Sequence, residues 1–440
     1  MKTRGRWRLS VMMGLLYAVQ GAFWPLLGVH LSELGIDGRW RGLIFASQAL
    51  AATLMPLGAG QLVDRLMPTQ SFLVAAYSAG TLLLAALASG GITGGPALCA
   101  TFLLYFAIIM PTHSLSSSLA MRNLDDPRRE FAAVRLWGTI GWMAVGWAVS
   151  GVMLALNGGR VPSVSPGGMH EVFWIASGLS AAMAVYCSTL PNTPPLAGET
   201  TGRANLRKGV ELLRERDVRV FLITTFGVFL TIPLAYQVVP GYLAARGMPR
   251  PWIATAVSIN QVPEIIALAA MPWLLTRLGY KGTMALGLGA WTLRYLILSL
   301  HPPLWLAVGV GVLQGVGIAC FSIGGQVFLD GRAPATHRAS VQALFLVAST
   351  GLPSLLGSLA AGEWVRRAGL GADAWVFVVP CILNGALLVY FLRGFRAQPS
   401  ISGRPGAAVS QIDADTPQRQ HTRRGAIACV GDLTTESADG

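Results

Sequence analysis

Long apolar stretches follow one another along the whole chain, separated by short polar joints. Twelve of them can be distinguished, most of them 19 to 26 residues long, and the clearest lie at 9–31, 42–63, 72–89, 97–119, 132–157 and 220–243. A helix rises about 1.5 Å per residue, so each stretch can cross the roughly 30 Å hydrocarbon core of a bilayer. A backbone surrounded by lipid must pair its own N–H and C=O groups, which a helix does within itself. The pattern therefore predicts an all-α membrane protein with twelve transmembrane helices.

The composition agrees with a membrane protein, and the distribution of charge predicts its orientation. Apolar residues make up 53% of the chain and charged residues 12%, whereas a soluble domain carries about 25% charged residues. The net charge of +13 would suit a nucleic-acid partner, but the basic residues gather in alternate joints, before residue 9, at 122–129 and at 203–219. By the positive-inside rule, the N-terminus, the long middle joint and the C-terminus lie in the cytoplasm. We expect a multi-pass protein of the cell (inner) membrane that contacts lipid and binds no nucleic acid.

The longest joint divides the apolar stretches into six and six. It covers 191–219, begins with prolines and continues as a basic, helix-prone segment. A related landmark closes the second stretch of each half, Asp64-Arg65-Leu66 in the first and Arg277-Leu278-Gly279 in the second. Repeated six-helix units are typical of secondary transporters that bind their substrate between the halves. We expect an N-terminal bundle at 1–190, a cytoplasmic linker at 191–219, a C-terminal bundle at 220–396 and a disordered cytoplasmic tail at 397–440.

The sequence shows no pattern typical of an enzyme or a metal protein. The five cysteines have no metal-ligand spacing, and neither a nucleotide-binding loop nor a nucleophile triad can be recognised. The stretch at 9–31 is too long for a signal-peptide core and is followed by no small-residue cleavage site before Trp40, so it is interpreted as a retained helix. We expect no catalysis, no cofactor and no metal.

Several short motifs are similar to those of a known transporter family. The run from Gly60 to Arg65 resembles the loop 2–3 signature of major facilitator transporters, although the usual trailing basic cluster is replaced by an apolar segment. Sharper matches resemble the nucleoside:proton symporter family within that superfamily, and the run Arg-x-Trp-Gly-Thr-x-Gly at 135–141 is the most specific. These matches are Met110-Pro111-Thr112, the run from Val134 to Trp142, Gln261-x-x-Glu264, Ala290-Trp291-x-Leu293-Arg294 and Arg338-Ala339-Ser340-x-Gln342. The resemblance covers about 10–395 and implies a major facilitator fold, a nucleoside-like substrate and protons as the coupled ion; we expect a monomer.

Charged side chains inside the apolar stretches are the first candidates for a site, because a charge in the bilayer costs several kcal/mol. Gln261 and Glu264 share one helix face, and Pro263 between them removes a backbone donor. The resemblance implies that both bind substrate hydroxyl groups, and Glu264 is also the candidate for proton coupling. The alternative is a structural ion pair of Glu264 with Arg294, since each lies 15 residues from Gly279, where the chain is expected to turn. One residue can serve both roles.

A second group of candidates lies on the fifth stretch. Arg135, Thr139 and Trp142 follow at helical spacing and share one face. The resemblance implies that Arg135 binds or steers the substrate, whereas an arginine that snorkels to the cytoplasm is the alternative. Thr139 and Trp142 are expected to contact the ring of the substrate. His113 is interpreted as a hydrogen-bonded histidine or a proton relay, and further side chains expected to line the cavity are Gln20, Trp24, Tyr236, Gln237, Gln314 and Gln326.

One departure from the family bears on the transport mechanism. Family members carry an Asp in the tenth helix where this chain has Ala319, so Glu264 is the one carboxylate expected near mid-membrane. We expect alternating-access uptake of a nucleoside or a similar polyhydroxylated molecule with protons, and Asp64 and Arg65 are expected to lock the cytoplasmic gate. An uncoupled facilitator remains an alternative. So does an efflux carrier for apolar or cationic compounds, although the fifth stretch lacks the Gly-x-x-x-Gly-Pro run of many exporters.

Overall fold

The computed structural model describes residues 2–156, 168–193, 212–332, 342, 344–368 and 375–396, without the side chains of 2–4, 57–66, 127–129 and 212. Helices joined by turns and short irregular connections make up these residues, and the described ranges contain no strand. The described residues, which end at 396, belong to one compact unit. The tail predicted at 397–440, most of the linker and the motif at 338–340 lie outside the described residues.

Six long helices make up the first part of the chain. Each coincides with one of the apolar stretches, and the helices are α1 (Lys2–Glu33), α2 (Gly38–Leu66), α3 (Thr69–Ala88), α4 (Gly95–Asn123), α5 (Pro127–Leu156) and α6 (His170–Ser188). Their lengths of 19 to 32 residues are sufficient to cross a bilayer.

The second part of the chain begins with the short 3₁₀ helix η1 (Leu212–Arg214) and uses more broken helices. The crossings are built from α8 (Arg216–Ala245), α9 (Arg250–Ser258), α10 (Gln261–Ala269), α11 (Met271–Ser299), α12 (Leu304–Gly309), α13 (Val312–Gly317), α14 (Gly324–Arg332), α16 (Leu352–Ala368) and α17 (Trp375–Gly394). Two π-helical segments, η2 (Ile318–Ile323) and η4 (Val347–Gly351), interrupt the tenth and eleventh crossings. Segments of this kind are frequent at functional sites.

A glycine turn inside α11 confirms the hairpin expected at that position. Gly279 has φ +65°, a left-handed conformation that glycine adopts without the steric cost of a Cβ atom. Residues 271–278 therefore complete the eighth crossing and residues 280–299 form the ninth. Ten helical segments of the described chain are long and apolar enough to span a membrane. Together with α2 and the second part of α11, these segments supply the twelve crossings that the sequence predicts.

The eighth crossing is broken near its middle, between α9 and α10. Pro263 has no N–H to donate to the carbonyl of Ile259, and this carbonyl instead accepts from the N–H of Val262 at 3.1 Å. The helix is interrupted at Ile259 and Asn260 as a result. The break lies directly before Gln261, which was predicted to bind substrate.

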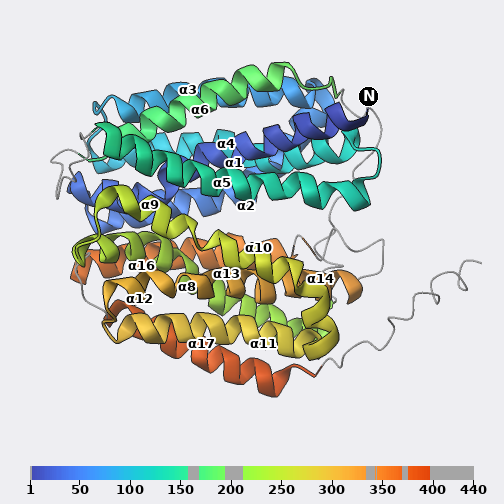
Figure 1. Cartoon of the computed structure of the whole chain (residues 1–440), viewed down its shortest axis with the longest axis vertical. Helices are drawn as coiled ribbons and strands as arrows, with labels where there is room; N and C mark the ends of the chain where they lie inside the picture. The colour runs from blue at the N-terminus through green and yellow to red at the C-terminus, as the bar shows by residue number, and fades with distance from the viewer. Residues whose placement is uncertain are drawn as a thin grey trace, which may run out of the picture. The chain divides into compact units, whose positions relative to one another are not determined.

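The helices of each part pack mainly with one another. In the first part α1 packs on α5, α2 on α4 and α3 on α6; in the second part α8 packs on α16, α11 on α17, and α13 on both α10 and α11. Figure 1 shows the ribbons α1 to α6 gathered together and those from α8 to α17 gathered together. The two groups meet through α2 with α16, α5 with α9 and α1 with α8.

Large apolar side chains point away from the protein interior, as expected for a surface covered by lipid. Leu82, Val185, Trp305 and Ile382 are 67% to 73% exposed. Soluble monomers rarely expose apolar surface on this scale. The polar side chains inside the molecule are therefore the ones that require a functional or structural explanation.

Candidate functional site

A cavity of about 800 Å³ lies between the two groups of helices. One side is formed by α1, α2 and α5, and the other by α8, η2, α14, η4 and α16. Amide and hydroxyl side chains supply most of its polar surface, among them Gln20, Gln48, Ser322, Gln326, Gln342 and Ser349. None of the described residues that line it carries a charge. The cavity therefore suits an uncharged solute that forms several hydrogen bonds.

Aromatic rings form the other part of the cavity wall. Trp24 of α1 contacts Phe45 of α2 with ring centroids 4.9 Å apart, and it lies 6.4 Å from Tyr236 of α8. Trp142 of α5 and Phe345 add two further rings. Because flat apolar rings alternate with hydrogen-bonding groups, the wall can hold a flat ring and its polar edges at the same time.

Most of the lining residues expected from the sequence are found in this wall. Gln20, Trp24, Tyr236 and Gln326 line the cavity, which confirms those predictions. The prediction for Gln237 is wrong, because its side chain is buried and donates to the carbonyl of Ser358 at 3.2 Å. Sequence reasoning missed Gln48 and the hydroxyl groups of η2 and η4. Each is a polar side chain within an apolar stretch, and this feature could have identified them as candidates for the cavity wall.

Of the three candidates on α5, Trp142 lies in the cavity wall and the other two do not. Trp142 borders both the large cavity and a small pocket beside it. The guanidinium of Arg135 lies over the ring of Tyr17 on α1, 4.2 Å from its centroid. Thr139 is half-buried on the same helix. Arg135 and Thr139 line neither cavity in this conformation.

The candidates on α10 lie beside the small pocket. Gln261 lines that pocket, which has a volume of about 30 Å³. Glu264, one turn further, is half-buried. The positive charge that acts on its carboxylate is that of Arg135, from the other group of helices, at more than the 4.0 Å of a direct ion pair.

The ion pair considered between Glu264 and Arg294 is not formed in this structure. Arg294 donates to Oε1 of Gln314 at 2.8 Å instead. The two residues do come from neighbouring segments of one hairpin, but α13 packs against both α10 and α11. A Cβ atom at Gly315 of α13 would lie 3.2 Å from Pro263 Cβ, so the two helix backbones are in close contact. The lateral position of α13 could not be inferred from the spacing of residues along the hairpin.

Two remaining predictions concern groups near the ends of the helices. Asp64 and Arg65, the predicted cytoplasmic gate, lie in α2, and their side chains are outside the described ones. The ring of His113 packs edge-on against Tyr17 with centroids 5.0 Å apart, and its Nε2 is buried without a hydrogen-bond partner among the described residues. The hydrogen bond expected at His113 is therefore not seen at this nitrogen.

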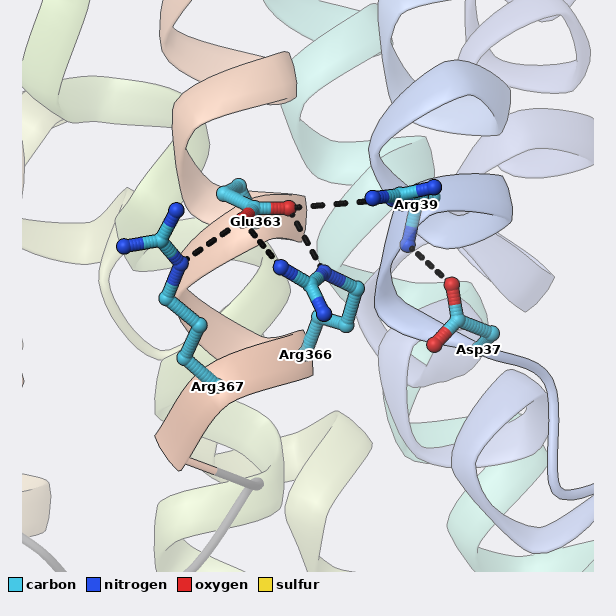
Figure 2. A network of polar contacts seen from close by, with 5 residues as sticks. All are labelled: Asp37, Arg39, Glu363, Arg366 and Arg367. Atoms are coloured by element: carbon cyan, nitrogen blue, oxygen red, sulfur yellow. Dashed lines mark hydrogen bonds and ion pairs between the residues drawn. The ribbon is translucent and has the colours of Figure 1, made fainter.

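A network that sequence reasoning missed joins the two groups of helices at the end where α1 leads into α2. Glu33 of α1 and Arg250 of α9 form an ion pair in which both side chains are less than 10% exposed. Figure 2 shows Arg39 of α2 facing Glu363 of α16, 4.0 Å apart, while Glu363 also accepts from Arg366 and Arg367. These charges stand at the ends of the helices, and no role for them was predicted from the sequence.

The chain is similar to known transport proteins over most of its length. Residues 1–400 match the family described as "Nucleoside H+ symporter". The putative nucleoside transporter YegT of Escherichia coli strain K12 is 31% identical over 381 residues, which covers 83% of this chain and 85% of that protein. The xanthosine permease of the same organism is 26% identical over 414 residues, 88% of this chain and 95% of that protein.

The solved structure of the nucleoside transporter NupG has the same fold. It matches with a TM-score of 0.77 at 22% identity and covers 89% of this chain and 99% of that chain. This similarity confirms the all-α, major facilitator fold predicted from the sequence.

Proposed function

The chain belongs to the nucleoside H⁺ symporter family, and from that premise we propose that it takes up a nucleoside together with protons by alternating access. Its relatives are transporters and permeases, so it is a multi-pass membrane carrier and not an enzyme. The observation that carries the choice of substrate is the cavity of about 800 Å³ between the two groups of helices, lined by amides, hydroxyls and aromatic rings.

The chemistry of the cavity favours a nucleoside over the cationic compounds of the efflux alternative. A cation taken out of water requires a carboxylate or a comparable negative partner, and the described lining residues offer none. A nucleoside is neutral, has hydroxyl groups that pair with amides such as Gln20 and Gln326, and has a flat base that packs against Trp24 and Trp142.

The residues proposed to act on the substrate come from both groups of helices. Trp142 contacts the ring, and Gln261 and Glu264 bind the ribose hydroxyls from the break in the eighth crossing. Thr139 and Arg135, about one and two turns from Trp142 on α5, join the site when the helices rearrange around the substrate. Glu264 carries the proton, because Ala319, fully buried in η2, supplies no carboxylate in the tenth crossing.

The proposal extends to the place of the protein in the cell. Residues 1–190 and 220–396 act as two halves that rock about the substrate, joined by a cytoplasmic linker. The carrier works as a monomer in the inner membrane, with both termini in the cytoplasm and the α1–α2 connection outside. The pair of Glu33 and Arg250 then belongs to an outer gate, and Asp64 and Arg65 to a cytoplasmic one.

Ligand stabilisation of the purified protein tests the proposed substrate class. The thermal unfolding midpoint is measured with a panel of nucleosides, free sugars and lipophilic cations, each over a range of concentrations. A ligand at 100 times its dissociation constant stabilises the folded state by about 2.7 kcal/mol, which raises the midpoint measurably. We expect stabilisation by nucleosides and none by the cations. Stabilisation by the cations alone would support the efflux alternative and refute the proposal.

A further inference from the structure

The guanidinium of Arg294 is a buried cation that forms no ion pair with a carboxylate of the described residues. Its side chain is 4% exposed, and no Asp or Glu among the described residues lies within 4.0 Å of it. Its Nε is buried and has no hydrogen-bond partner in the described chain. A buried charge without a partner is strongly destabilising, and charged side chains inside a membrane mark binding sites more often than packing.

Gln314 of α13 accepts a hydrogen bond from this guanidinium, and its own NH₂ group remains available as a donor. Its Oε1 accepts from Nη1 of Arg294 at 2.8 Å and from Nε1 of Trp291 at 3.1 Å. Both partners can only donate, so the orientation of the amide is determined by chemistry. The NH₂ group of Gln314 therefore faces the other way, and Gln314 lines the small pocket beside the main cavity.

Asn260 also borders this pocket. It lies at the break between α9 and α10, and its buried Oδ1 packs against Gly311 of α13. The pocket of about 30 Å³ is lined by Asn260, Gln261, Arg294 and Gln314, and it shares Trp142 and Tyr236 with the main cavity. A space of this size holds one or two oxygen-sized groups, so it can receive the edge of a ring but not a whole base.

We infer that this pocket binds the edge of the nucleobase and selects bases that present a carbonyl oxygen there. The N–H groups of Arg294 and Gln314 donate to this oxygen. The base lies against Trp142 at the boundary of the two spaces. Uracil and hypoxanthine carry a carbonyl oxygen at this edge. Cytosine and adenine carry an amino group in its place, which sets donor against donor next to the positive charge of Arg294.

The inference rests on the proposed function and adds a substrate class to it. A site built to form hydrogen bonds rejects an analogue that leaves its buried polar groups unpaired more strongly than it rejects a change of size. The nucleosides offer two nearly isosteric pairs, uridine with cytidine and inosine with adenosine. The ratio of rates within a pair is independent of how much active protein each preparation contains.

The experiment measures initial uptake of the four nucleosides into proteoliposomes that contain the full chain. The unchanged protein is expected to prefer uridine over cytidine and inosine over adenosine by about tenfold or more, equivalent to roughly 1.4 kcal/mol. In Gln314→Glu, the new carboxylate still accepts from Trp291 and Arg294 but neutralises the guanidinium and removes the amide donor. Both ratios are expected to fall towards one.

A matched substitution on the cavity wall controls for the added carboxylate. Gln326→Glu introduces the same group on α14, away from the pocket, and is expected to change both members of each pair together. If the unchanged protein transports all four nucleosides equally, or if Gln314→Glu keeps the preference, the inference is overturned while the proposed function stands. If none of the four is transported or bound, the proposed function itself is refuted.

Discussion

For Glu264, a role in transport can be distinguished experimentally from a role in the stability of the fold. It forms no ion pair within 4.0 Å among the described residues, so replacing it by an uncharged amide leaves no partner behind. Glu264→Gln is therefore expected to abolish concentrative uptake and to leave the thermal unfolding midpoint unchanged within about 2 °C. The measurement is transport in proteoliposomes together with thermal unfolding of the same preparation.

Asp125→Asn provides the control for this substitution. Asp125 is an exposed carboxylate between α4 and α5, and its neutralisation is expected to change neither uptake nor stability. Full uptake by Glu264→Gln would remove Glu264 from the transport mechanism. A large loss of stability in that variant would assign it a structural role instead.

At the scale of single residues, the positions of polar groups could be predicted from the sequence more accurately than their interaction partners. Gln20 and Tyr236 could be placed in a cavity because hydrogen-bonding side chains on apolar helices avoid lipid. The partner of Arg294 could not be predicted. Spacing from Gly279 determines depth along one hairpin, but the position of Gln314 depends on how α13 packs sideways, which the sequence does not encode locally.

At the scale of helices, the apolar stretches predicted the number and order of the crossings, because each must span the same hydrocarbon thickness. The breaks within the helices were only partly predictable. Pro263 removes a backbone donor and indicated the break between α9 and α10. The π-helical segments η2 and η4 carry no comparable signal in the sequence, since their extra residue is accommodated by packing around the cavity that they line.

The pair of Glu33 and Arg250 connects α1 to α9, and in the proposed mechanism it holds the outer gate closed. Breaking one partner of a buried ion pair costs about 3–5 kcal/mol, and about 5.5 kcal/mol moves a two-state equilibrium from 1:99 to 99:1. Glu33→Gln is therefore expected to populate the state in which this end is open. The readout is a cysteine at Ala49, in the cavity wall, in a chain without its five native cysteines. A membrane-impermeant thiol reagent added to intact cells should label it faster in Glu33→Gln.

Two further variants test whether the charge pair causes the change. The exchange Glu33→Arg with Arg250→Glu restores the pair and is expected to restore slow labelling. Arg39→Gln removes a contact across the same interface whose arginine side chain is 70% exposed, and exposed pairs contribute little, so labelling should stay slow. Equal labelling in all variants would show that this pair does not gate the cavity. Labelling only after the cells are broken open would place this end in the cytoplasm and reverse the proposed orientation.

At the scale of the whole molecule, the proposed coupling of protons to the substrate rests on the positions of Glu264 and Arg135 in different groups of helices. The charge of Arg135 acts on Glu264 without a direct ion pair, so any rocking of one group against the other changes their separation. The Coulomb energy of the two charges varies with that separation, and the proton affinity of Glu264 varies with it between the two access states. A carboxylate that also binds the substrate then links proton binding to substrate binding through the same conformational change.

Uptake into proteoliposomes under an imposed pH gradient tests this coupling. With the outside more acidic, the unchanged protein is expected to accumulate nucleoside above the external concentration, and a protonophore that dissipates the gradient should reduce accumulation to equilibrium. Glu264→Gln should show neither accumulation nor a response to the gradient, because the one carboxylate predicted near mid-membrane is gone. Accumulation that ignores the protonophore would indicate another driving ion. Equilibration alone, with or without the gradient, would indicate an uncoupled facilitator, in which the separation of Glu264 and Arg135 affects substrate binding and not proton transfer.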